Sequence, residues 1–146
     1  MIQIIKATNE NVNELTDMGL ELWPNNEYEY LKNDFTYIIG HLKDIIYLAR
    51  SDKEYIGFIH MSIRNDYVEG SNTSPVAYLE GIYTKPDFRK MGVARDLYNA
   101  GIKWAKSKGC SQVGSDIGLN NDLCFNFHGK MGFEEANRVI CFITDI

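Results

Sequence analysis

The chain has 146 residues, of which 45% are hydrophobic and 24% charged, and its formal net charge is −5. This length fits a single domain over residues 1–146 that buries its own core without disulfides or a structural metal. No apolar run approaches the roughly 20 residues that a membrane span needs, so integral membrane function is excluded. The acidic balance argues against nucleic acid and favours a cationic ligand.

The cysteines and the N-terminus bear on the compartment. Cys110, Cys124 and Cys141 show no CxxC spacing, and any pairing leaves one over, so we expect buried, reduced thiols in a cytoplasmic protein. The three cysteines and three histidines are scattered without ligand spacing, and no metal site is expected. No basic region precedes a long apolar run at the N-terminus, so no secretory signal is expected.

The first forty residues predict a strand and two helices. Ile2 to Lys6 forms a short β run, and Thr8 or Asn9 caps a helix that Pro24 ends. Apolar residues at helical spacing predict a second helix over 28–39.

Three strands follow. The β runs 44–50 and 55–64 flank the turn composition 51–54, which predicts a hairpin. A polar loop over 65–75 precedes a strand over 76–84. Glu80 and Gly81 interrupt that last strand. A carboxylate and a glycine inside an apolar strand indicate a bulge or the close approach of a ligand.

The last part alternates helices and strands. We expect a helix opening within 89–94 and ending near Gly109, a strand over 110–116, a short helix over 122–131, and final strands over 133–135 and 139–144. The crossover from 76 to 116 implies a parallel pair, while the hairpins imply antiparallel strands. The fold class is therefore α/β, with a mixed α+β sheet flanked by helices.

The segment Arg89-Lys90-Met91-Gly92-Val93-Ala94 is typical of an anion site. It follows a strand and opens a helix, whose first N–H groups and positive end suit a phosphate. Gly92 and Ala94 leave the backbone bare, and the basic side chains add counter-charge for a pyrophosphate. For the short string alone, an ordinary helix start with solvated basic residues is the better explanation.

The segment also resembles the pyrophosphate loop of the GCN5-related N-acetyltransferases, with its Q/R-x-x-G-x-G/A pattern. The resemblance includes residues 83–86 before the loop and Lys130-Met131-Gly132-Phe133 near the end, in the family's order. It implies that family's acyltransferase fold, a mostly antiparallel mixed sheet with a parallel pair in the middle, and acetyl-CoA as the acetyl donor.

A closer resemblance covers nearly the whole chain. The segments 22–24, 62–70, 74–76, 79–83 and 115–116 are similar to the aminoglycoside 6′-N-acetyltransferases of the branch with a swapped-strand dimer. This implies an aminoglycoside as acceptor, antibiotic resistance as the outcome, and a homodimer that exchanges its C-terminal strand.

The resemblance also implies site residues, position by position. The implied antibiotic contacts are Trp23, Asn26, Tyr67, Glu80, Asp116 and Asn137, of which Asn26 and Asn137 differ from the polar or acidic residues of similar enzymes. The implied acetyl-CoA contacts are Ile82, Tyr83, Thr84, Arg89, Lys90, Met91, Gly92, Val93, Ala94 and Asn121. The implied catalytic set is Glu80, Asp116 and His128.

Residue chemistry agrees with this interpretation and leaves alternatives. Glu80 and Asp116, on adjacent strands, fit a cleft for ammonium groups, and either suits a general base. A salt bridge would equally explain Glu80, a cap Asp116 or Asn121, and ordinary packing Trp23 and Tyr67. A satisfied, partly buried histidine would explain His128. The alternative functions are an acetyltransferase for another amine, such as a polyamine or a peptide N-terminus, and a non-catalytic acyl-CoA- or drug-binding module.

Overall fold

The computed structural model describes residues 1–146, with five strands and four α-helices. In chain order the elements are β1 (Ile2–Lys6), the 3-10 turn η1 (Asn9–Asn11), α1 (Val12–Leu22), α2 (Tyr28–Ile39), β2 (Asp44–Ser51), β3 (Glu54–Arg64), β4 (Val76–Thr84), the 3-10 turn η2 (Pro86–Phe88), α3 (Val93–Ser107), β5 (Val113–Ser115) and α4 (Asp122–Lys130). None of the helices has the length and hydropathy needed to cross a bilayer.

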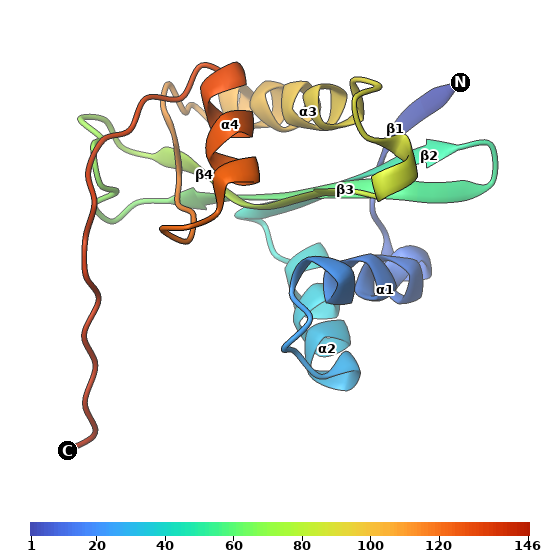
Figure 1. Ribbon diagram of the computed structural model, residues 1–146, viewed down its shortest axis with the longest axis horizontal. Coiled ribbons are helices and arrows are strands. Elements are labelled where there is room, and N and C mark those ends of the chain that lie inside the picture. Colours follow the sequence, from blue (N-terminus) through green and yellow to red (C-terminus); the bar gives the residue numbers. More distant parts are fainter.

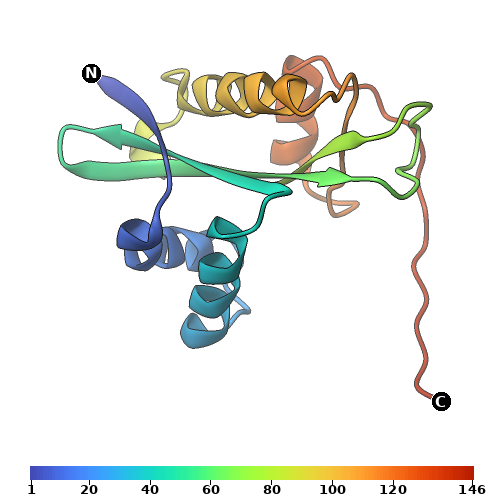
Figure 2. The same ribbon diagram turned by 180° about the vertical axis from the view of Figure 1, so that it is seen from behind.

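The molecule has three layers, with the sheet in the middle (Figure 1). Helices α1 and α2 cover one face, and α3 and α4 lie on the other, which Figure 2 shows from behind. One core cluster packs α3 against the sheet through residues such as Leu97, Ile59 and Met61. The second packs α1 and α2 against the opposite face through Leu15, Phe35 and Phe58. The sheet is therefore buried on both faces, as its apolar strands require.

The strand order is β1-β2-β3-β4-β5, and all neighbours are antiparallel except the parallel pair β4–β5. Register shifts between His60 and Met61, because Gly81 pairs with His60 whereas Leu79 pairs with Met61. Glu80 is therefore the extra residue of a β-bulge in β4, as its sequence context predicted. The bulge turns Glu80 and Gly81 toward the same face, that of α1 and α2, where Glu80 meets Ser62 and Gly81 meets Trp23.

The mixed α/β class and most elements agree with the sequence prediction, but the end of the chain does not. The strands expected over 133–135 and 139–144 are wrong for the single chain, because no strand lies beside these residues to pair with them. Instead the chain runs away from the body to its C-terminus (Figure 1). The parallel pair consequently lies at the edge of the five-stranded sheet and not in its middle.

The cysteine prediction was correct only in part. All three thiols are free, and Cys110 is buried, but Cys124 is half-buried and Cys141 is exposed. Cys141 lies in the exposed end of the chain, where the apolar side chains Val139, Ile140, Phe142 and Ile143 are exposed as well, so its apolar pattern did not lead to burial.

Candidate active site

A cleft of about 310 Å³ opens between the two N-terminal helices and the bulge of β4. Helix α2, strands β3 and β4, and the loop between α1 and α2 contribute the side chains that line it: Trp23, Asn26, Leu31, Asp34, Phe35, Ile38, His60 and Glu80. Trp23 packs against Phe35 and Phe58, with ring centroids 6.5 and 6.1 Å away, so the indole is a rigid wall. The cleft brings together Trp23, Asn26 and Glu80 of the expected acceptor residues.

Glu80 is held by two side chains of the neighbouring strand. The Ser62 hydroxyl donates to its Oε1 at 2.6 Å, and Arg64 Nη2 donates to Oε1 and Oε2 at 2.9 and 3.1 Å. The salt bridge that the sequence left open as an explanation of Glu80 is therefore present. The ion pair fixes the carboxylate at the mouth of the cleft, where Glu80 remains about one-quarter exposed and open to a ligand.

Asp116 lies one strand further along the sheet. Leu79 pairs with Ser115 in the parallel β4–β5 ladder, so the next residue on each strand is Glu80 and Asp116. The two carboxylates are therefore strand neighbours, as expected. The Tyr78 hydroxyl donates to Asp116 Oδ2, and burial together with this carboxylate raises the pKa of Tyr78 far above its usual value. Tyr78 is consequently a neutral donor at working pH.

Arg64 links the two carboxylates. Its guanidinium lies 3.4 Å from the centroid of the Tyr78 ring, while its nitrogens bind Glu80. A cation on an aromatic face is favourable by about 0.5–2 kcal/mol. The result is a connected polar row, Glu80–Arg64–Tyr78–Asp116, across β3, β4 and the end of β5.

His128 on α4 has both ring nitrogens satisfied. Nδ1 lies 2.6 Å from the carbonyl oxygen of Cys124, and Nε2 lies 2.7 Å from Ser115 Oγ. Because a carbonyl only accepts, Nδ1 carries the proton, and the neutral ring accepts from the Ser115 hydroxyl at Nε2. The partly buried, satisfied histidine is what the structure shows.

The loop before α3 has the geometry of an anion site. Gly92 precedes the helix in the left-handed region at φ 85°, and nothing lies within 4 Å of where its Cβ would stand. No side chain caps the first turn of α3, so its amide N–H groups remain free. Lys90 and Met91 are exposed, whereas Arg89 donates from Nε to the Thr84 carbonyl at 2.9 Å, which ties the loop to the end of β4.

The edge of β4 next to this loop is open. The β5 strand pairs only with residues 77–79, so the backbone of Ile82, Tyr83 and Thr84 has no strand on that side. Unpaired N–H and C=O groups at a strand edge can form hydrogen bonds with another extended chain. The open edge therefore offers hydrogen-bond partners to an extended ligand, and the start of α3 offers N–H groups to an anion.

Asn121 caps α4, which was the alternative to a cofactor contact. Its Oδ1 accepts from the Cys124 N–H at 3.2 Å. The amide nitrogen of Asn121 makes no hydrogen bond in the chain and is exposed, so the cap leaves a donor for a second partner.

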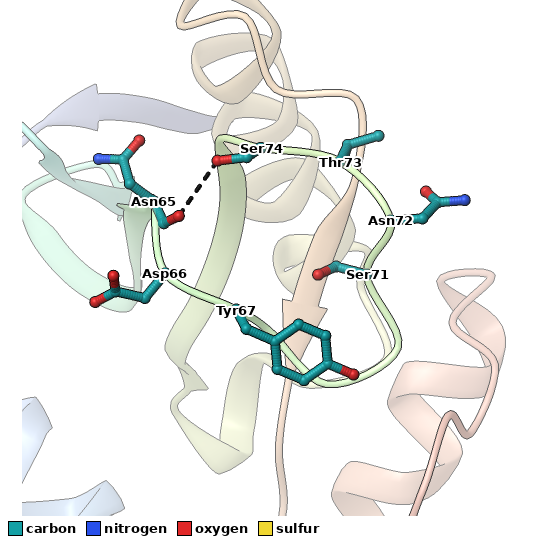
Figure 3. Close-up of a pocket in the computed structure, with 7 residues that line it drawn as sticks. All are labelled: Asn65, Asp66, Tyr67, Ser71, Asn72, Thr73 and Ser74. Carbon is teal, nitrogen blue, oxygen red and sulfur yellow. Dashed lines mark hydrogen bonds between the residues drawn. The ribbon is translucent and has the colours of Figure 1, made fainter.

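Two expected acceptor contacts lie outside the cleft. Tyr67 is 75% exposed and belongs to a separate hollow of about 410 Å³ in the β3–β4 loop, drawn in Figure 3 with Ser74 bonded to the Asn65 carbonyl. Asn137, just after α4, donates to Glu69 Oε1 of the same loop at 2.8 Å. The single chain therefore does not bring Tyr67 or Asn137 into contact with Glu80.

Sequence reasoning missed the side chains that organise the site. Ser62 and Arg64 hold Glu80, and Tyr78 holds Asp116. His60 lines the cleft and is held by Asp44. One signal was available, because polar residues recur at every second position of β3 after Phe58, which is the period of a strand face.

A comparison with protein families agrees with this geometry. Residues 9–133 match the model of the acetyltransferase (GNAT) family, and the chain belongs to that family. The predicted family and enzyme class, an N-acetyltransferase, are thereby confirmed.

Two relatives show which enzymes of the family this chain is similar to. Over 124 residues the chain is 40% identical to an aminoglycoside N(6′)-acetyltransferase type 1 of Salmonella typhimurium, with 84% of each protein covered. It is 33% identical to the protein of the same name from Acinetobacter haemolyticus over 145 residues, 99% of each.

Solved structures show the same fold. The structure of AAC(6′)-Iy in complex with the bisubstrate analogue CoA-S-monomethyl-acetylneamine has a TM-score of 0.95 at 33% identity, covering 100% of this chain and 99% of that one. The 6′-N-acetyltransferase AAC(6′)-Ih of Acinetobacter baumannii has a TM-score of 0.94 at 32% identity, with the same coverage.

Proposed function

We propose that the protein transfers the acetyl group of acetyl-CoA to the 6′-amine of aminoglycosides and thereby confers resistance to them. The observation that carries the proposal is the polar row from Glu80 to Asp116, which borders an acidic cleft on one side and the open edge of β4 on the other. Polycationic amines suit a cleft in which carboxylates outnumber the single guanidinium. The relatives named for this reaction support the same acceptor.

In this proposal the acetyl-CoA donor supplies an activated thioester, and the chain aligns the acceptor amine with it. Glu80 or Asp116, directly or through a water molecule, takes the proton that an alkylammonium group must lose before it attacks. The N–H of Ile82 or Tyr83, beside the bulge, donates to the oxyanion. Much of the acceleration comes from holding two substrates together.

Further residue roles belong to the proposal. The loop 89–94 holds the pyrophosphate, Asn121 donates its free amide to the cofactor arm, and His128 with Ser115 stabilises or protonates the departing thiolate. Trp23 and Asn26 contact the antibiotic within the cleft, while Tyr67 and Asn137, which lie outside the cleft in the single chain, remain predicted contacts. The 146 residues act as one domain in the cytoplasm, where three free cysteines stay reduced.

The exposed C-terminal segment supports a homodimer. Apolar side chains of this segment have no neighbour in the single chain: Val139, Ile140, Phe142 and Ile143 are 66%, 82%, 91% and 99% exposed. A strand-forming apolar segment seeks a sheet edge, and we propose that it pairs with a second copy. Deleting residues 137–146 is expected to give a monomer in sedimentation experiments, and an unchanged mass would refute the exchange.

A matched pair of antibiotics tests the regiochemistry. Neomycin and paromomycin differ at the 6′ position, where neomycin carries an amine and paromomycin a hydroxyl. Acetylation of neomycin without acetylation of paromomycin is the expected result, measured by mass spectrometry of the products. Equal acetylation of both would place the reaction at another amine.

A further inference from the structure

A hydrogen-bonded chain of three side chains lies beside the cleft and has no place in the proposed chemistry. Asp44, at the start of β2, accepts from His60 Nε2 at Oδ1, 2.7 Å, and pairs at Oδ2 with Nδ1 of His41, 2.6 Å. His60 and Asp44 are well buried, with 11% and 14% of their side chains exposed, whereas His41 is 39% exposed. The three side chains do not converge as metal ligands.

Asp44 fixes the tautomer of His60. Burial opposes the ionisation of Asp44, but the hydrogen bonds from His60 and His41 outweigh it and lower its pKa. The carboxylate is therefore ionised and only accepts, so Nε2 of His60 carries a proton. In the neutral ring the lone pair is then on Nδ1, and that nitrogen makes no hydrogen bond within the chain.

His60 lines the acceptor cleft, while His41 does not. The ring stands across from Gly81 on β4, next to the bulge that presents Glu80. The charged groups around the ring are Asp44 of β2, Asp34 of α2, and Glu80 of β4 with its partner Arg64. Trp23, which follows α1, is the uncharged neighbour on that side. A basic nitrogen without a partner thus borders a cleft lined by carboxylates.

We propose that His60, held by Asp44, is a specificity-determining residue for the acceptor: its Nδ1 accepts a hydrogen bond from an ammonium or hydroxyl group of a polycationic acceptor. Asp44 is the positioning residue. This inference rests on the proposed function, because it assigns a contact within the same acceptor site.

The free nitrogen selects for hydrogen-bond donors. A ring nitrogen without a proton only accepts a hydrogen bond, and the ammonium and hydroxyl groups of a polycationic acceptor are donors.

Two substitutions separate the two nitrogens of the ring. His60→Gln places an amide near the position of Nε2 and keeps a donor to Asp44, but it has no acceptor at the position of Nδ1. His60→Asn places its amide near Nδ1 and does not reach Asp44. His41→Gln is the matched control, because it alters the other imidazole on Asp44 outside the cleft.

The experiment is steady-state acetylation of kanamycin by the full chain at pH 8. His60→Gln is expected to raise the kanamycin KM about tenfold, the effect of one hydrogen bond to a charged group, with the acetyl-CoA KM and the melting temperature unchanged. His60→Asn is expected to keep part of the affinity, and His41→Gln to follow the wild type.

The outcomes distinguish the inference from the function on which it rests. A kanamycin KM for His60→Gln within twofold of the wild type would overturn the inference. No turnover of kanamycin by the wild type would refute the proposed function alone. In that case the same variants are compared with spermidine as the acceptor. Equal spermidine KM values for the wild type and His60→Gln would also overturn the inference.

Discussion

Gly81 is the position at which the smallest substitution should disturb the acceptor cleft most. A Cβ added there would stand 2.6 and 2.7 Å from two carbons of the Trp23 ring. Carbon atoms rest at about 3.6 Å, so Gly81→Ala must displace the indole by about 1 Å. The ring cannot simply swing aside, because Phe35 and Phe58 pack against it.

The displacement has two measurable consequences. Overpacking of this kind costs about 1–3 kcal/mol, which at this chain length lowers the melting temperature by about 3–10 °C. A misplacement of about 1 Å in a substrate-positioning wall lowers kcat/KM by up to about a hundredfold. The loss should fall on the aminoglycoside, while the acetyl-CoA KM changes little, because the anion loop before α3 does not contact Trp23.

The assay is thermal unfolding together with steady-state kinetics in both substrates. Gly129→Ala on α4 is the matched control, since nothing lies within 4 Å of its added Cβ and its φ is not positive. A Gly81→Ala variant that melts like the wild type and acetylates kanamycin with unchanged kcat/KM would refute the close packing of Trp23 on the bulge.

Three further predictions concern the carboxylates and the anion loop. Asp116→Asn is expected to lower kcat about a hundredfold or more while the dissociation constant of acetyl-CoA, measured by calorimetry, stays within about twofold; unchanged turnover would contradict its role. Gly92→Ala meets no neighbour, but its φ of 85° opposes a side chain by about 1–2 kcal/mol, so the acetyl-CoA KM should rise several-fold and the kanamycin KM should not. The lowered pKa of Asp44 stabilises the fold above the ordinary aspartate range near pH 4, and this contribution is lost as the pH falls through the still lower folded-state value. Asp44→Asn should therefore reduce the melting temperature at pH 6 and weaken its fall in acid, and parallel curves for the two proteins would count against the assignment.

The elements that periodicity predicts best are those whose packing and pairing partners lie within the same chain. The helix Tyr28–Ile39 and the strands Ile2–Lys6 and Val76–Thr84 have the bounds that their patterns indicate. The apolar run over 139–144 has the same kind of pattern and forms no strand, because a strand needs a partner and the single chain offers none.

The prediction of the site from the sequence has the same limit, because it too depends on which residues become neighbours in the fold. The bulge at Glu80 and the adjacency of Asp116 follow from local sequence and from the order of the strands. The ion pair with Arg64 and the bond from Tyr78 depend on cross-strand register, which one sequence does not specify residue by residue. Asn121 was open to two interpretations, and its cap and its free amide show that the two are compatible.

The most direct test of the account is steady-state consumption of acetyl-CoA with kanamycin, spermidine and a peptide amine as parallel acceptors. Thioester loss should be followed by absorbance, because the exposed Cys141 would react with a thiol reagent. The account predicts a kcat/KM for kanamycin at least about a hundredfold above the other two, the discrimination that about 3 kcal/mol of transition-state binding gives. Turnover of spermidine or the peptide amine without kanamycin, or no turnover of any of the three, would contradict it.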